Sequence, residues 1–176
     1  MARPLRILFP DAYYHVTCRG NERKPIYRDD TDRRSFIGKL KVSCEIYDVR
    51  IHAYVLMANH FHLIVQTPAG NLPAFMRHFN ISYTAAFNRR HDRVGHLYQG
   101  RYKAILIEQD SYLLELSRYV HVNPIRVRGY QREEYQKQIT LLKSYPWSSL
   151  SGKRVLGSSL ELVSWSPEIL SPSRTR

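Results

Sequence analysis

The segment VRIHAYVLMANHFHLIVQT, residues 49–67, constrains the fold more than any other part of the chain. It contains two short apolar runs, residues 49–57 and 60–66, separated by Ala58 and Asn59. Short runs rich in β-branched and aromatic residues are typical of strands, and a two-residue break between them is typical of a tight turn. The segment therefore predicts a β-hairpin.

The patterns on either side of this hairpin predict two more strands and three helices. The strands have β-branched and aromatic character, and the helices have apolar residues at helical spacing after capping residues or before a glycine or proline. Pro124 is expected to end the last helix, because proline cannot continue its hydrogen bonds. The strands are expected at residues 13–21 and 96–107, and the helices at 31–47, 72–95 and from 110 onward.

The order of the predicted elements indicates the fold class. Strand, helix, two strands, helix and strand form the split arrangement βαββαβ, followed here by one more helix. We therefore expect an α+β, ferredoxin-like fold: an antiparallel sheet with helices on one face, the other face partly free, and a C-terminal tyrosine-bearing helix. Composition shifts after Arg128 to charged and then Ser/Pro-rich sequence. This predicts a domain at 1–130 and a C-terminal extension at 131–176 that packs on the domain or extends from it.

The charge of the chain points to a class of partner. Its 176 residues include 27 Lys and Arg against 15 Asp and Glu, a formal net charge of +12. Such an excess favours binding to phosphate backbones, so nucleic acid is the first expected partner and an anionic membrane surface the second. No apolar run is long enough to span a membrane, and Cys18 and Cys44 are expected to be buried thiols in a reducing compartment. These features predict a cytoplasmic protein.

Two histidines lie one residue apart in the second strand of the hairpin. Because successive side chains of a strand point to opposite faces, His60 and His62 share one face while Phe61 points to the other. Two neutral imidazoles on one face are a ready pair of metal ligands, although a lone His-x-His is more often simply exposed polar sequence.

The last predicted helix carries a second candidate pair. Tyr119 and Asn123 are four residues apart and therefore lie on one helix face. An amide oxygen with two imidazoles suits Mn²⁺ or Mg²⁺, and a metal that polarises a phosphate can offset the weak nucleophilicity of a phenol. The same residues also fit a packing tyrosine and a helix-ending asparagine.

Several motifs together resemble a known family. NHFHL at 59–63 is similar to the histidine-hydrophobe-histidine motif of the HUH single-strand DNA nucleases, and RYVHVNPIR at 118–126 resembles the tyrosine helix of REP-associated tyrosine transposases. YYHVTCRGNER, AYVLMANHFHLIVQT, GHLYQGRYKA and YPWSSL also fit that family, in that order. The resemblance spans residues 13–150.

The resemblance implies a reaction and a set of residues. It implies metal ligation by His60 and His62, a third ligand at Asn123, and Tyr119 as the nucleophile. It implies a divalent metal, Mg²⁺ or Mn²⁺, and cleavage and rejoining of single-stranded DNA next to REP-like hairpins through a 5′-phosphotyrosine. It also implies a bacterial protein that is nucleoid-associated when bound to DNA. The Asn-Pro after the tyrosine favours the branch that acts as a monomer over the homodimers that exchange the tyrosine helix.

Ten further residues are candidates for contacts to DNA. The basic ones are expected to contact phosphates, and two tyrosines are expected to stack on unpaired bases. Each taken alone is more often a solvated charge or a core-edge aromatic. The set is Arg19, Arg23, Lys24, Tyr98, Arg101, Tyr102, Lys103, Arg118, Arg126 and Arg128.

Three other functions remain open from the sequence. A non-catalytic module that binds single-stranded nucleic acid would place aromatics on the central strands and would give Tyr119 and Asn123 no role. A replication initiator or relaxase would share the chemistry but usually needs more chain. A metal-dependent hydrolase that uses water would tolerate the loss of Tyr119.

Overall fold

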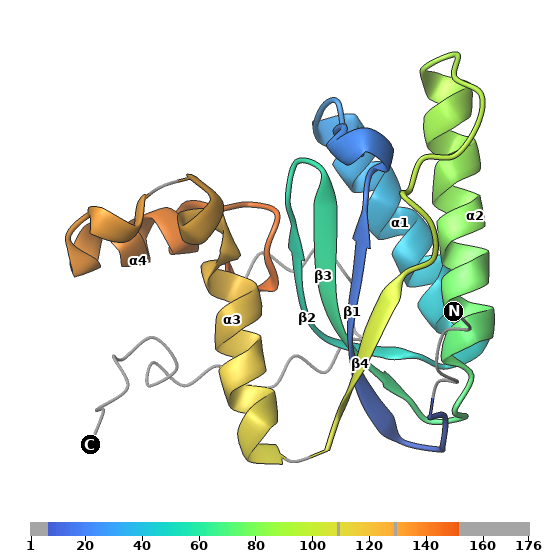
Figure 1. Ribbon diagram of the computed structural model, residues 1–176, viewed down its shortest axis with the longest axis horizontal. Helices are drawn as coiled ribbons and strands as arrows, with labels where there is room; N and C mark the ends of the chain where they lie inside the picture. The colour runs from blue at the N-terminus through green and yellow to red at the C-terminus, as the bar shows by residue number, and fades with distance from the viewer. Residues whose placement is uncertain (1–6, 109, 129, 152–176) are drawn as a thin grey trace.

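A computed structural model gives the fold of residues 7–108, 110–128 and 130–151, and the side chains of 110–112, 127, 128, 131 and 151 are not described. The strands and helices follow one another along the chain in the predicted order, and a further short helix comes after them (Figure 1). The bounds are β1 (Ala12–Arg19), α1 (Asp30–Tyr47), β2 (Arg50–Leu56), β3 (His60–Thr67), α2 (Leu72–Arg90), β4 (Lys103–Ile107), α3 (Asp110–Arg128) and α4 (Tyr135–Ser144), with short 3-10 turns η1 (Asn21–Arg23), η2 (Tyr130–Arg132) and η3 (Ser149–Ser151).

The four strands form one antiparallel sheet in the order β2-β3-β1-β4. The predicted hairpin is confirmed as β2 and β3, and the ferredoxin-like arrangement is confirmed with it. The strand expected at 96–107 is shorter than predicted, because only Lys103–Ile107 pairs with β1. Gly100, at a φ of 122°, turns the chain just before this strand, a conformation that favours glycine.

The two helices α1 and α2 cover one face of the sheet (Figure 1). The core between them is strongly aromatic. Phe36, Phe61 and Phe79 pack edge to face, with ring centroids 4.8–6.0 Å apart, and all three are fully buried. This face buries the large apolar area that stabilises the domain.

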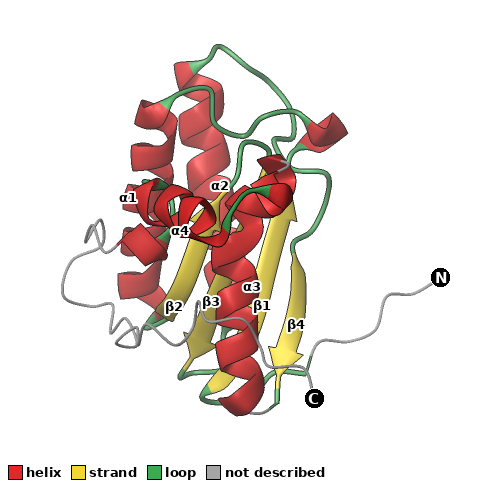
Figure 2. Ribbon diagram, turned by 90° about the vertical axis from the view of Figure 1, so that its left-hand side faces the viewer, coloured by secondary structure: helices red, strands yellow, loops and turns green. Residues whose placement is uncertain are grey.

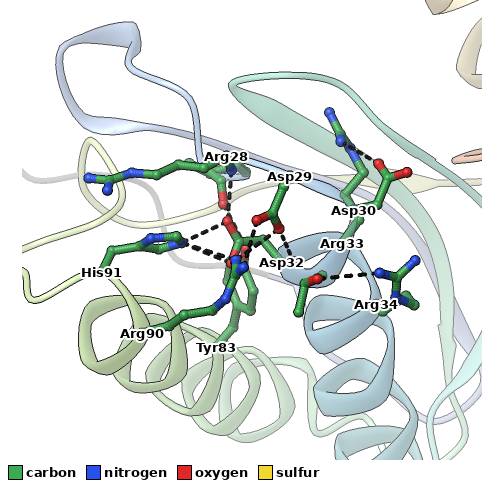
Figure 3. Close-up of polar contacts among 11 residues, drawn as sticks. Arg28, Asp29, Asp30, Asp32, Arg33, Arg34, Tyr83, Arg90 and His91 are labelled. Carbon is green, nitrogen blue, oxygen red and sulfur yellow. Dashed lines mark hydrogen bonds and ion pairs between the residues drawn. The ribbon is translucent and has the colours of Figure 1, made fainter.

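A network of ion pairs joins the N-terminal end of α1 to the C-terminal end of α2 (Figure 3). Arg90 binds Asp29 with contacts of 2.6 and 2.8 Å and also binds Asp32, which accepts from His91 Nε2 at 2.8 Å and from the Arg28 amide at 2.7 Å. The Arg90 guanidinium holds the pKa of the Asp29 carboxyl well below its ordinary value. The network fixes the N-terminal end of α1 relative to the C-terminal end of α2.

The opposite face of the sheet carries α3 (Figure 2). A smaller apolar cluster joins the helix to the strands, and it includes Val55, Ile64, Leu116 and Val120. The face that was expected to be partly free is thus partly covered by the tyrosine-bearing helix. This places α3 against β2, β3 and β4, and brings its Tyr119 against His15 of β1.

Pro124 lies inside α3, which continues to Arg128, so the prediction that proline ends this helix was wrong. Pro124 has no N–H to donate to the carbonyl of Val120 four residues earlier. The Asn123 side chain takes over this role: its Nδ2 lies 3.3 Å from the Val120 oxygen and 2.8 Å from the Tyr119 oxygen. An amide donor next to the proline therefore satisfies the Val120 carbonyl that the proline leaves without a backbone donor.

The segment after α4 packs along the outer edge of β2. Leu56 donates its N–H to Trp147 O at 2.8 Å, and its carbonyl accepts from Tyr145 Oη at 2.6 Å. Ser149 Oγ bonds the Tyr54 N–H at 3.0 Å and lies 2.7 Å from His121 Nε2 on α3. Ser149 therefore links α3 to β2. The domain division at residue 130 stays a prediction, and residues 152–176 of the extension lie outside the described part.

Candidate active site

Alternate side chains of β3 lie in different environments. Phe61 is fully buried in the aromatic core, whereas His62, 7% exposed, and the partly buried His60 point to the α3 side. The ring centroids of His60 and His62 are 5.2 Å apart. The alternation expected from the sequence is therefore the one that the strand adopts.

A third histidine belongs to this group, and the sequence interpretation missed it. His15 lies on β1, next to β3, where it is paired with Ile64 while its neighbour two residues on, Thr17, is paired with His62. His15 Nε2 lies 2.8 Å from His62 Nδ1, and the two rings stack with centroids 5.1 Å apart. Strand alternation alone could not find His15, because its proximity to His62 depends on the register between β1 and β3.

Burial keeps the three imidazoles neutral. It lowers the pKa of His15 and His60 to about 4 and that of His62 to about 3, with smaller contributions to His60 and His62 from the nearby cation of Arg19. A neutral imidazole has one nitrogen with a lone pair, which is what a metal ion requires.

Tyr119 on α3 lies against this histidine cluster. Its ring is edge-on to His62 and His15, with centroid distances of 5.8 and 6.0 Å. The guanidinium carbon of Arg126 lies over the Tyr119 ring, 5.0 Å from its centroid. Tyr119 is 38% exposed, so its hydroxyl can be reached from outside while its ring is held between a cation and two imidazoles. The structure therefore brings the predicted histidines and tyrosine together within one chain.

Asn123 lies one turn after Tyr119 on the same helix face and is 5% exposed. Its Nδ2 is committed to the carbonyls of Tyr119 and Val120. This fixes the orientation of the amide, so that the oxygen is the atom left for another partner.

The donor atoms fit a divalent ion. Two imidazoles that share one ion through bonds of about 2.1 Å have ring centres about 5 Å apart, close to the 5.2 Å between His60 and His62. Among the residues that the structure describes, no group of three His, Cys, Asp or Glu side chains could hold a metal ion. Two imidazoles and an amide oxygen are a donor set that suits a hard ion such as Mg²⁺ or Mn²⁺.

The basic candidates for DNA contacts are spread around this site. Arg19 is paired with His60 across β1 and β3, and Arg126 contacts Tyr119, so both lie at the site itself. Arg118 is partly exposed on α3. Lys24 forms an ion pair of 2.6 Å with Glu22 in the turn after β1. Exposed side chains further out are Arg23, Arg101 and Lys103, and the side chain of Arg128 lies outside the described part.

Tyr98 and Tyr102 lie in a different environment from the one expected. Each is only 8% exposed and belongs to the aromatic core with Phe61. Neither ring presents an open face on which a base could stack, because the segment before β4 folds back over the core and Tyr98 pairs with Gly20. The burial of these tyrosines indicates a packing role.

Comparison with known proteins assigns the chain to a family. The family model for IS200-like transposases matches residues 9–123, well over half of the chain, and this match includes β1, the histidine pair and Tyr119. The chain belongs to the IS200-like transposase family. No curated protein sequence matches this IS200-like transposase. No helix among its described residues is long and apolar enough to cross a membrane.

One solved structure confirms the fold. The structure of a REP-associated tyrosine transposase bound to a REP hairpin is similar to this transposase with a TM-score of 0.70 at 16% identity, covering 98% of this chain and 96% of that one. A Deinococcus radiodurans protein described as a transposase has a TM-score of 0.48 at 14% identity, covering 68% and 95%. The tRNA(His) guanylyltransferase of Saccharomyces cerevisiae also has 0.48, at 10% identity, covering 96% and 86%.

Proposed function

We propose that this transposase is a metal-dependent single-strand DNA endonuclease and strand transferase with Tyr119 as its nucleophile. The observation that carries the proposal is the position of Tyr119, whose ring lies 5.8 Å from that of His62 in the same chain. A phenol on a helix and two imidazoles on a strand come together although they are far apart in sequence. A non-catalytic binding module gives no reason for this arrangement.

The reaction follows from the groups at the site. The Tyr119 oxygen attacks the scissile phosphorus, the bond from phosphorus to the 3′ oxygen breaks, and the phenolic proton is released as the 3′ oxygen gains one. The products are a 5′-phosphotyrosine and a free 3′-hydroxyl, and attack by another 3′-hydroxyl reverses the step. Because one phosphoester replaces another, strand transfer needs no external energy source.

His60, His62 and Asn123 would hold the divalent ion. When bound, the ion supplies Lewis-acid polarisation of the scissile phosphate and lowers the barrier to attack by a weak nucleophile. Arg126, whose guanidinium carbon lies 5.0 Å from the centroid of the Tyr119 ring, would hold the nucleophile in position and contact the negatively charged phosphate. Arg19, paired with His60 across β1 and β3, would contact a phosphate of the bound strand.

We propose single-stranded DNA with a hairpin as the substrate. The support is the formal net charge of +12 and the likeness in fold to a REP-associated transposase that was solved with a REP hairpin. Exposed basic side chains around the site would supply phosphate contacts and a strong dependence on salt. On this proposal the protein acts in the bacterial cytoplasm, at the chromosome.

The test uses labelled single-stranded DNA with an imperfect palindrome from the flanks of the protein's own gene. Wild type, Tyr119→Phe and the double variant His60→Ala/His62→Ala are incubated with Mn²⁺ or with EDTA and separated on denaturing gels. We expect a covalent protein–DNA adduct only for wild type with Mn²⁺. Cleavage that persists in Tyr119→Phe without an adduct would mean that water is the nucleophile, and the assignment of Tyr119 would be wrong.

The contacts of α3 further support action as a monomer. His121, which is fully buried, and Ser149 link the tyrosine helix to β2 of the same chain. Mixing Tyr119→Phe with His60→Ala/His62→Ala tests this, since each protein keeps one half of the site. We expect no adduct from the mixture. Recovery of the adduct would show that helices exchange between two chains in a homodimer.

A further inference from the structure

Both histidines of the proposed metal site have the same ring nitrogen engaged by a neighbour. His60 Nδ1 lies 2.7 Å from Asn59 Oδ1, and His62 Nδ1 lies 2.8 Å from His15 Nε2. The two neighbours come from different elements, the turn of the hairpin and the strand β1. In each ring the opposite nitrogen, Nε2, is left for another partner.

The Asn59 contacts decide which atom carries the hydrogen on His60. The Nδ2 of Asn59 donates to the carbonyl of Arg23 at 2.8 Å, and a carbonyl can only accept. The amide oxygen of Asn59 must therefore face His60, and it too can only accept. His60 Nδ1 is thus the donor, and its Nε2 carries the lone pair.

His15 contacts Nδ1 of His62 in the same way that Asn59 contacts Nδ1 of His60. When His62 Nδ1 donates to His15 Nε2, the lone pair of His62 is on Nε2, as in His60. His15 itself cannot share an ion with that atom, because it contacts the Nδ1 side of the His62 ring and Nε2 lies on another edge. The geometry makes His15 a partner of a ligand and not a third ligand.

We propose that Asn59 and His15 are positioning residues that hold His60 and His62 in the tautomer with an unprotonated Nε2. The proposal rests on the proposed function, since it gives these atoms a metal to bind. Free histidine in water favours hydrogen on Nε2, so without the two acceptors each ligand would have to change tautomer before binding. Partners of this kind change metal affinity by about 10- to 100-fold in other sites.

The first experiment measures the tautomers directly in the metal-free wild-type protein. Long-range ¹H–¹⁵N correlation spectra of the imidazoles at neutral pH distinguish a hydrogen on Nδ1 from one on Nε2. We expect the Nδ1–H form for His60 and His62. Nε2–H signals for either ring would overturn the proposal for that ring, whatever its activity.

The second experiment measures Mn²⁺ affinity by calorimetry. We expect about 10- to 100-fold weaker binding for His15→Phe and for Asn59→Ala, and partial recovery in His15→Gln, whose amide oxygen can accept from His62. His78→Gln is the matched control, because His78 bonds Ser43 on the other face of the sheet and should leave affinity unchanged.

The outcomes separate this inference from the proposed function. Unchanged Mn²⁺ affinity in both His15→Phe and Asn59→Ala would overturn the positioning role even if wild type forms the DNA adduct. If wild type binds no Mn²⁺, the proposed function fails at its metal site, and the tautomers of the metal-free protein still decide whether Asn59 and His15 act as stated.

Discussion

The two faces of the sheet differ in what they contribute, and β3 shows the difference one residue at a time. Toward α1 and α2 it presents Phe61, Leu63 and Val65, all fully buried among aromatic and aliphatic side chains. Toward α3 it presents His60 and His62 before the pattern returns to apolar Ile64. The face toward α1 and α2 is the apolar framework of the fold. The face toward α3 has polar side chains in place of apolar ones at the proposed active site.

The buried polar side chains on the α3 face are paired with one another or with the backbone. The polar α3 face relies on hydrogen bonds for its order: His15 with His62, Asn59 with His60, and His121 with Ser149. A buried polar group is costly when it lacks a partner. The α3 face should therefore be sensitive to changes in protonation, and the framework to changes in volume.

Acid is expected to have the largest effect, because it acts on several side chains of the α3 face together. Burial lowers the pKa of His15, His60 and His121 to about 4 and that of His62 to about 3, whereas an unfolded histidine titrates near 6.5. Between about pH 6.5 and pH 4 the unfolded chain binds more protons than the folded one. Stability should be full above about pH 7 and fall progressively below 6.5.

Urea unfolding in EDTA at a series of pH values measures this dependence. His121→Gln removes one titrating group and should reduce the slope of stability against pH in that range. A free energy of unfolding that stays constant from pH 7 to pH 4.5 would show that these imidazoles are not buried in neutral form.

Substitutions at two neighbouring positions of β3 should differ in their cost to stability, because the two side chains lie on opposite faces of the sheet. Phe61→Ala removes a buried ring from the framework and should cost about 3–5 kcal/mol. His62→Ala removes one hydrogen bond and leaves the buried His15 without that partner, so it should cost about 1–3 kcal/mol, while it abolishes Mn²⁺ binding. Metal-free urea unfolding at neutral pH gives both values. Equal costs would contradict the division into a framework face and a chemical face.

The smallest expected effect is an energetic coupling between Asn123 and Pro124 in α3. Asn123→Ala leaves the Val120 carbonyl without its side-chain donor and should cost about 1 kcal/mol. In a Pro124→Ala background the backbone N–H of residue 124 can take that role, so the cost of Asn123→Ala should nearly vanish. A double-mutant cycle by urea unfolding measures this coupling. Additive effects would show that Asn123 does not compensate for the proline.

The periodicity of the sequence predicts much of the framework and about half of the residues at the candidate site. The alternation in β3 placed Phe61 in the core and both histidines on the other face, and helical spacing placed Tyr119 and Asn123 on one face of α3. These are properties of a single segment, and local geometry determines them.

The rest depends on contacts between segments, which a local pattern does not contain. His15 was missed because only the register of β1 against β3 brings it to His62. The burial of Tyr98 results from the fold-back before β4. Pro124 was misjudged because its effect on α3 is offset by the side chain of Asn123.

The central claim is that the α3 face of the sheet holds a metal ion beside a nucleophilic tyrosine. Its most direct test is a crystal structure of the protein grown with Mn²⁺, with anomalous scattering measured to locate the ion. We predict one strong peak bonded to the Nε2 atoms of His60 and His62 and to the oxygen of Asn123, next to the Tyr119 ring. An ion bound through Nδ1, or anomalous peaks only elsewhere on the protein, would contradict the account.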